Sequence, residues 1–173
     1  MIRKEMSDRV LESIEQIHAA TLYQVDCLNE TLTNLRYEGK AFLGKNLKEI
    51  RSVLKFLNRE LIPHVKFEEE FIFPFVKTHI PKLESLIHLL RAQHKELQEH
   101  LKNFESLLEK SGKEGFDVND GRALEKIREQ GIYINYLIQH HIQVENESIY
   151  KIVDSELNHH EKKELAQLSS ARS

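Results

Sequence analysis

Six side chains in this sequence combine the residue types and spacing that a metal centre needs. Two histidines are each followed by a glutamate four residues later, and two further histidines stand alone. Residues four apart on an α-helix differ by about 40° of rotation and one turn of rise, so each His/Glu pair projects from one face of its helix. The predicted metal ligands are His18, His64, Glu68, His94, His141 and Glu145.

The two glutamates lie on helix faces that are otherwise apolar. His141 and Glu145, for example, are in phase with Leu137 and Ile138. Burying an unpaired carboxylate is strongly unfavourable, and two buried carboxylates that face each other would also repel. A pair of divalent or trivalent cations would remove both penalties, so the pattern favours a metal centre over a purely structural bundle.

The proposed ligands also form an internal repeat. His18 precedes His64 by 46 residues, and His94 precedes His141 by 47. Each half of the chain therefore contributes one lone histidine and one histidine that is followed by glutamate. This repeat predicts a site with approximate twofold symmetry.

The number of donor atoms indicates which metal would bind. Four imidazole nitrogens and the oxygens of two bridging carboxylates supply eight donors, whereas two six-coordinate ions have twelve positions. An oxo or hydroxo bridge would fill two more, which leaves about two positions for a small ligand. Mixed imidazole and carboxylate ligation suits iron, with manganese or zinc as alternatives. The predicted cofactor is a pair of non-haem iron ions, bridged by the carboxylates and by oxo or hydroxo.

Other polar residues fall off the ligand stripe. His140 is the only rival for the position of His141, but it lies about 100° away on the helix and has no glutamate partner at four residues. Gln98, one turn from His94, is predicted either to bond a metal-bound water or to be an ordinary buried glutamine. Cys27 is predicted to pack as a small hydrophobe. The residues predicted to face solvent are Glu69, Glu70, His88, His100 and Glu147. His159 and His160 lie near a predicted helix N-terminus and are predicted to have no function.

The elements that must position these residues are helices. The chain has only six Gly and three Pro in 173 residues, and apolar residues recur at intervals of three and four. We predict an all-α fold, an antiparallel up-down four-helix bundle with a short C-terminal helix, formed by one domain over residues 1–173. The predicted long helices span about residues 7–36, 46–75, 81–108 and 124–152.

Local signals predict how the helices begin and bend. Asn46 with Glu49, and Asn158 with Glu161, have the spacing of capping boxes. Pro63 lacks a backbone donor, which predicts a kink or bulge immediately before the ligand that follows it.

The connection between the third and fourth long helices is the only long loop predicted. It covers residues 111–121, and either Asp117 or Asp120 is predicted to cap the fourth helix.

Composition excludes several classes of function. A net charge of -3 without a basic stripe argues against nucleic acid as a partner. The first residues lack an apolar signal core and the longest apolar runs are too short to span a bilayer, so we predict a cytoplasmic protein that does not bind membranes. The single cysteine fits a reducing compartment.

The segments LIPHVKFEEEFIFPFV (61–76) and LIQHHIQVENESIYKIV (137–153), with EQIHAAT and RAQHKEL around the lone histidines, resemble the hemerythrin-like, HHE cation-binding family. The resemblance covers essentially the whole bundle. It implies that the four histidines are terminal ligands and that Glu68 and Glu145 bridge two irons. Oxygen-carrying hemerythrins have a second histidine where this chain has Gln98, and an aspartate five residues after the last histidine. The resemblance is therefore to the branch that includes iron-sulfur-cluster repair proteins and iron and oxygen sensors.

These observations predict a non-haem di-iron protein that binds or reacts with oxygen, nitric oxide or peroxide, in oxidative or nitrosative stress response or in iron homeostasis. The alternative is a sensing or storage module without catalysis. A structural bundle or a zinc protein is a third hypothesis. Whether the protein is an enzyme, and which proteins it binds, are left open.

Overall fold

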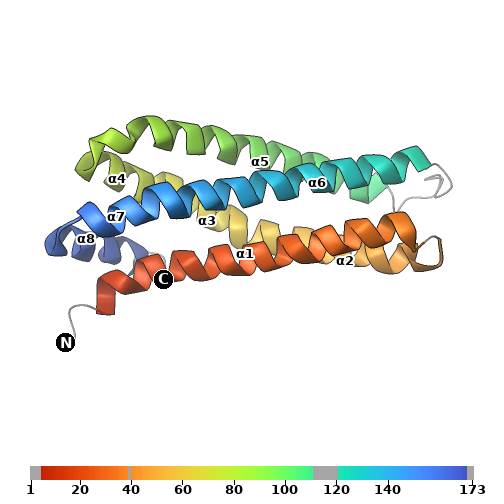
Figure 1. The fold of residues 1–173 in the computed structure, drawn as a ribbon, viewed down its shortest axis with the longest axis horizontal. Coiled ribbons are helices and arrows are strands. Elements are labelled where there is room, and N and C mark those ends of the chain that lie inside the picture. Colours follow the sequence, from red (N-terminus) through yellow and green to blue (C-terminus); the bar gives the residue numbers. More distant parts are fainter. Residues whose placement is uncertain (1–4, 39, 111–120, 171–173) are drawn as a thin grey trace.

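The computed structural model describes residues 5–38, 40–110 and 121–170, and every regular element within them is helical. Four long helical segments lie side by side along the molecule, and a short helix closes one end (Figure 1). α1 contacts both α2 and α6, and α5 contacts the same two helices. The predicted bundle of four helices with a short C-terminal helix is confirmed. No helix in the described ranges is long and apolar enough to cross a membrane.

The first and third long segments are continuous helices, and the second and fourth are interrupted by π-helical turns. A 3₁₀ turn precedes α2, another precedes α5, and α8 follows the fourth segment. In chain order the elements are α1 (Glu5–Tyr37), a 3₁₀ turn (Lys40–Phe42), α2 (Leu43–Phe56), a π turn (Leu57–Leu61), α3 (Ile62–Phe67), a π turn (Glu68–Ile72), α4 (Phe73–His79), a 3₁₀ turn (Pro81–Leu83), α5 (Glu84–Lys110), α6 (Gly121–Val144), a π turn (Glu145–Tyr150), α7 (Lys151–Glu156) and α8 (His159–Ser170).

The irregularity predicted near Pro63 is present. The π turn Leu57–Leu61 ends two residues before this proline, and it inserts extra backbone ahead of α3. Proline cannot donate the backbone hydrogen bond that a regular helix would require there, so a π turn at this point accommodates it. The second segment continues past the predicted end near residue 75 and reaches His79.

One of the two predicted capping boxes is correct. At the start of α8, the backbone N–H of Asn158 donates to Glu161 Oε2 at 2.8 Å. Asn158 Oδ1 in turn accepts from the backbone N–H groups of His160 at 2.9 Å and Glu161 at 3.0 Å. These reciprocal bonds satisfy donors that the first turn of a helix leaves free.

The capping box predicted at Asn46 is wrong. α2 already begins at Leu43, led in by the 3₁₀ turn Lys40–Phe42, and Asn46 lies buried within the helix. Its amide instead donates to Glu38 Oε2 at 3.1 Å. The asparagine therefore connects α2 to the end of α1, because the neighbouring carboxylate satisfies its amide. Of the loop predicted at 111–121, only Gly121 is described, and it is the first residue of α6. The rest of that loop and the predicted caps Asp117 and Asp120 lie outside the described residues.

The hydrophobic core consists of two clusters, one on each side of the predicted ligands. In α1, Ile14 belongs to one cluster and Val25 to the other, and His18 lies between them. In α5, Leu90 and Leu97 are separated in the same way. The polar layer is therefore enclosed at both ends by packed apolar side chains, which keep water away from it.

Candidate metal centre

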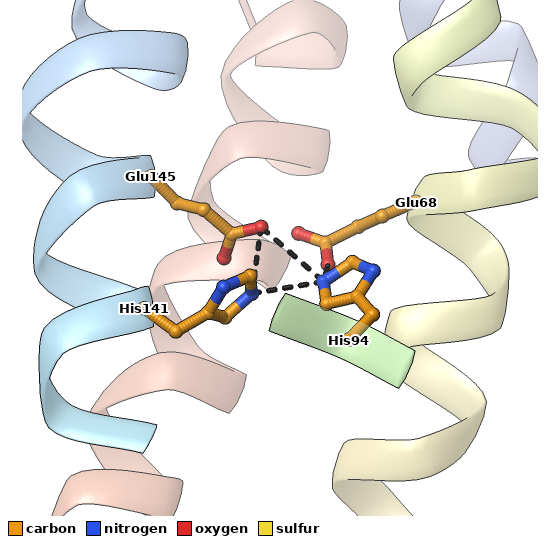
Figure 2. Close-up of side chains that lie close together, drawn as sticks. All are labelled: Glu68, His94, His141 and Glu145. Carbon is orange, nitrogen blue, oxygen red and sulfur yellow. Dashed lines mark hydrogen bonds and ion pairs between the residues drawn. The ribbon is translucent and has the colours of Figure 1, made fainter. Parts of the chain in front are cut away.

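The structure brings all six predicted ligands into one cluster. They extend from four different segments of the bundle, and each is at most 3% exposed. Figure 2 shows four of them, with both glutamates and two histidines directed toward a common centre. Their role as metal ligands stays a prediction, but their position in a single buried layer agrees with it.

The four histidines form two pairs. The Nε2 atoms of His18 and His64 lie 3.0 Å apart, and those of His94 and His141 lie 2.8 Å apart. Each pair joins two helices, since its members are 46 and 47 residues apart in the chain. In both pairs the rings meet edge to face, with their Nε2 atoms converging.

Each glutamate presents one oxygen to each histidine pair. Glu68 Oε1 lies 3.1 Å from Nε2 of His64, and Glu68 Oε2 lies 3.5 Å from Nε2 of His94. Glu145 Oε1 lies 3.1 Å from Nε2 of His141, and Glu145 Oε2 lies 3.3 Å from Nε2 of His18.

The cluster thus divides into two half-sites. The first half-site contains His18, His64, Glu68 Oε1 and Glu145 Oε2. The second half-site contains His94, His141, Glu68 Oε2 and Glu145 Oε1. The four groups of the second half-site lie close enough together to hold a metal ion, as do His18, His64 and Glu68 of the first. Glu145 Oε2 joins the first half-site through its 3.3 Å contact with His18 Nε2. Each carboxylate therefore belongs to both half-sites and presents one oxygen to each of them.

The donor distances agree with ligands of a common ion. Two donors bonded at about 2.1 Å to one ion and at right angles to each other are about 3 Å apart. In the second half-site, the two imidazole nitrogens are 2.8 Å apart and Glu145 Oε1 is 3.1 Å from the nearer one. The corresponding distances in the first half-site are 3.0 Å and 3.1 Å, with Glu68 Oε1 as the oxygen.

Outer hydrogen bonds fix which ring nitrogen faces the centre. Nδ1 of His18 lies 2.8 Å from Asn146 Oδ1, and Nδ1 of His141 lies 3.0 Å from Gln93 Oε1. Amide oxygens only accept hydrogen bonds, so each Nδ1–H donates and the lone pair of the neutral ring is on Nε2. Lone pairs that converge at about 3 Å repel each other unless a positive charge lies between them. The tautomers therefore suit metal binding at Nε2.

The carboxylates lack the partners that a buried anion requires. Glu68 Oε2 and both oxygens of Glu145 are buried without a hydrogen-bond partner among the described residues. Only Glu68 Oε1 has one, since the Tyr150 hydroxyl donates to it. Buried carboxylates normally have hydrogen bonds or a cation beside them. The donor set and these unpaired oxygens fit a pair of cations.

In the metal-free protein, protons supply part of this positive charge. Burial lowers the pKa of His18 and His94, but the nearby carboxylates of Glu145 and Glu68 outweigh burial, so both pKa values are raised. Burial would raise the pKa of Glu145. The neighbouring imidazoles, of which His141 has the largest effect, nevertheless hold this pKa well below its usual range. The cluster is thus built to be occupied by cations of some kind.

Sequence reasoning missed four residues that contact the ligands: Glu69, Gln93, Asn146 and Tyr150. Glu69 was predicted to face solvent, and that prediction is wrong. Its side chain is 35% exposed, and its Oε1 accepts from His94 Nδ1 at 2.9 Å. It lies beside Glu68, off the ligand face, but there it points at the neighbouring α5 and the outer edge of the His94 ring.

Tyr150 was missed because of helix geometry. It is five residues after Glu145, which in an α-helix places it about 140° away from that ligand. Residues 145–150 form a π turn, in which positions five apart are hydrogen-bonded and lie on the same face. Tyr150 therefore points back into the cluster. Nothing in α-helical periodicity indicates such a turn, although tyrosine in an otherwise apolar stripe is a signal worth testing.

The remaining predictions have mixed outcomes. Glu70 and Glu147 are exposed, and the His88 side chain is 68% exposed, as predicted. His140, His159 and His160 are also exposed. His100 was predicted to face solvent, but it is half-buried, with Nδ1 2.6 Å from Gln130 Nε2 and its ring against Tyr133. Cys27 packs against the core, as predicted. Gln98 is half-buried, and its contact with a metal-bound water stays a prediction.

Comparison with known families agrees with this geometry. A family model described as hemerythrin HHE cation binding domain matches residues 9–153, a range that includes all six predicted ligands. No curated protein matched the sequence.

Proposed function

The chain belongs to the hemerythrin HHE cation-binding domain family, and we propose that its two half-sites hold a pair of non-haem iron ions that bind or react with a small ligand. One observation carries this proposal. Each of two fully buried carboxylates, Glu68 and Glu145, presents one oxygen to each histidine pair. A single ion in one half-site would leave one oxygen of each carboxylate without a metal partner.

The chemistry of the donors favours iron. Each half-site offers two imidazole nitrogens and two carboxylate oxygens and no thiolate, a mixture that suits iron better than the softer metals. Iron, when bound, would supply redox chemistry and open coordination positions. Four protein donors per ion leave room for a shared bridging oxygen and a small exogenous ligand.

The surroundings favour a small ligand. The ring of Phe73 stacks on His94 with centroids 5.5 Å apart, and packed apolar clusters enclose the polar layer at both ends. Such a space excludes large substrates and most water. We propose that the ligand is oxygen, nitric oxide or peroxide, and that the protein acts in oxidative or nitrosative stress response or in iron homeostasis, in the cytoplasm.

A surface cavity of about 420 Å³ supports access to the first half-site. It is lined by Leu11, Glu15, Asn146, Tyr150, Lys151 and Asp154. Two of these residues also touch ligands, since Asn146 bonds His18 and Tyr150 bonds Glu68. These two side chains therefore line the cavity and also contact the cluster. Another cavity, of about 480 Å³ along α2 and α5, includes none of the six ligands and offers no such route.

Tyr150 is placed to hold a proton beside the metal positions. Burial, followed by the charges of Glu68 and Glu145, raises its pKa well above 10. The phenol therefore stays protonated at neutral pH and donates to Glu68 Oε1. This bond holds the orientation of the carboxylate and keeps the phenol proton beside the first half-site.

Iron content and ligand chemistry together test the proposal. Protein produced with ample iron should contain about two iron ions per chain, and fewer than about one would overturn the proposal. The reduced protein should then be mixed separately with oxygen and with nitric oxide while the visible spectrum is followed. A stable adduct that is lost on removing the gas identifies a binding or sensing role. Turnover with release of product identifies catalysis, and an unchanged spectrum with both gases would overturn the proposed ligand class.

A further inference from the structure

The two half-sites differ in the groups that surround their histidines. In the second half-site both outer nitrogens are hydrogen-bonded, His94 Nδ1 to the carboxylate of Glu69 and His141 Nδ1 to the amide oxygen of Gln93. In the first half-site only His18 has such a partner, the neutral side chain of Asn146. The outer nitrogen of the remaining histidine, His64, is buried without a partner among the described residues.

The internal repeat shows that these differences occur at equivalent positions. Glu69 directly follows Glu68, just as Asn146 directly follows Glu145. Glu69 bonds the lone histidine of the other half of the chain, His94, and Asn146 likewise bonds His18. A carboxylate in one half thus corresponds to an amide in the other.

The difference between His141, whose Nδ1 bonds Gln93, and His64, whose Nδ1 has no partner among the described residues, also occurs at equivalent positions. Gln93 directly precedes His94, and the equivalent residue before His18 is Ile17. Isoleucine has no acceptor, which agrees with the absence of a partner on His64 Nδ1. The fold is therefore close to twofold symmetric in its ligands but not in the groups that tune them.

A carboxylate that accepts an imidazole N–H increases the electron density at the opposite ring nitrogen and fixes the ring orientation. The position of Glu69 is itself held, because its backbone carbonyl accepts from Arg91 Nη2 of α5 at 3.0 Å. The side chain is 35% exposed, so solvent screens its charge only in part. The His94/His141 half-site consequently has stronger and better oriented nitrogen donors than its counterpart.

We propose that Glu69, with Gln93, makes the His94/His141 half-site the tighter of the two metal positions, so that a first metal ion is bound there. Glu69 is a positioning residue, since it acts through His94 and does not itself face the centre. The inference rests on the proposed function, because it requires metal ions at the cluster. It goes further in stating which half-site binds the first ion and which binds it more tightly.

A metal titration tests this inference without any activity assay. Metal-free, full-length protein is titrated with ferrous iron under anaerobic conditions, and bound metal and heat are measured. The unmodified protein should bind in two steps of different affinity. Glu69→Gln keeps the size of the side chain but removes its charge, and it should weaken the tighter step about 10- to 100-fold while leaving the other step unchanged.

Two further variants provide the comparison. Asn146→Ala removes the partner of His18 and should weaken only the weaker step. Glu70→Gln changes an exposed neighbour of Glu69 and should alter neither step. Circular dichroism of each variant checks that the bundle is folded.

The outcomes separate this inference from the di-iron proposal. Two steps of equal affinity, or a Glu69→Gln variant that binds like the unmodified protein, would overturn the inference and leave a two-iron site intact. A single bound ion whose affinity falls in Glu69→Gln but not in Asn146→Ala would support the inference and overturn the two-iron stoichiometry.

Discussion

The hydroxyl of Tyr150 donates a hydrogen bond to Oε1 of Glu68, although the two residues are 82 positions apart in the chain. The bond connects the π turn Glu145–Tyr150 to the π turn Glu68–Ile72, so that the two turns that begin with the proposed bridging carboxylates support each other. Each π turn departs from regular helix, and such turns occur frequently at functional sites. Here the departure lets a residue five positions after one carboxylate reach the other.

Removal of this hydroxyl should destabilise the metal-free protein. In Tyr150→Phe, Glu68 loses the only hydrogen-bond donor that its Oε1 has in the described structure, and bonds to charged groups are worth about 1.5–3 kcal/mol. We expect the free energy of unfolding in urea to fall by that amount. Tyr136→Phe, at a side chain that is 60% exposed, is the control and should have almost no effect. Equal stability of the two variants would show that the bond contributes nothing.

Loss of either bridging carboxylate should disable metal binding. Glu68→Ala and Glu145→Ala each remove an oxygen from both half-sites, so we expect iron content to fall to a small fraction of that of the unmodified protein. Glu70→Ala changes an exposed glutamate near the first of these and should keep full iron content. Elemental analysis of the purified proteins measures the difference. The same iron content in all three variants would contradict the ligand assignment.

Metal uptake should release protons. In the metal-free cluster, burial lowers the pKa of His18 and His94, but the nearby carboxylates of Glu145 and Glu68 outweigh burial and raise it. These imidazoles therefore carry protons at higher pH than ordinary histidines. A metal ion must displace those protons. Metal affinity should therefore rise with pH through the neutral range and fall in acid.

An indicator dye in weakly buffered solution measures this release as ferrous iron is added. His88→Gln, at an exposed histidine outside the cluster, is expected to release the same number of protons as the unmodified protein. Metal binding without proton release, or with an affinity that does not change between acid and neutral pH, would be inconsistent with this account.

Removal of the metal should lower the stability of the bundle. A ligand that binds only the folded state stabilises it by about 2.7 kcal/mol when its concentration is one hundred times the dissociation constant. We expect a chelator to lower the melting temperature of the loaded protein, and added ferrous iron to restore it under anaerobic conditions. Glu145→Ala should melt at the same temperature with and without chelator. A chelator effect as large in this variant as in the unmodified protein would place the stabilising metal elsewhere.

Much of the fold and of the ligand set could be predicted from local sequence. The spacing of His64 and Glu68, repeated at His141 and Glu145, puts each pair on one helix face whatever the neighbouring helices do. Helical periodicity likewise predicted α1 from about residue 7 to residue 36, close to its observed span of Glu5–Tyr37. The capping box at α8 was predictable because its hydrogen bonds join residues at most three positions apart.

Only the tertiary structure decided which groups surround the ligands. Asn46 has the spacing of a cap, but its amide donates to Glu38, the residue that follows α1, and a local pattern carries no information on such a partner. Glu69 lies off the ligand face of its own helix and still reaches His94, because packing brings α5 against its side. Tyr150 enters the cluster because a π turn changes the angular position of every residue after Glu145. The sequence alone thus determined which side chains share a helix face as predicted ligands, because this follows from the period of a helix. The packing of four helices decided the hydrogen bonds that surround them.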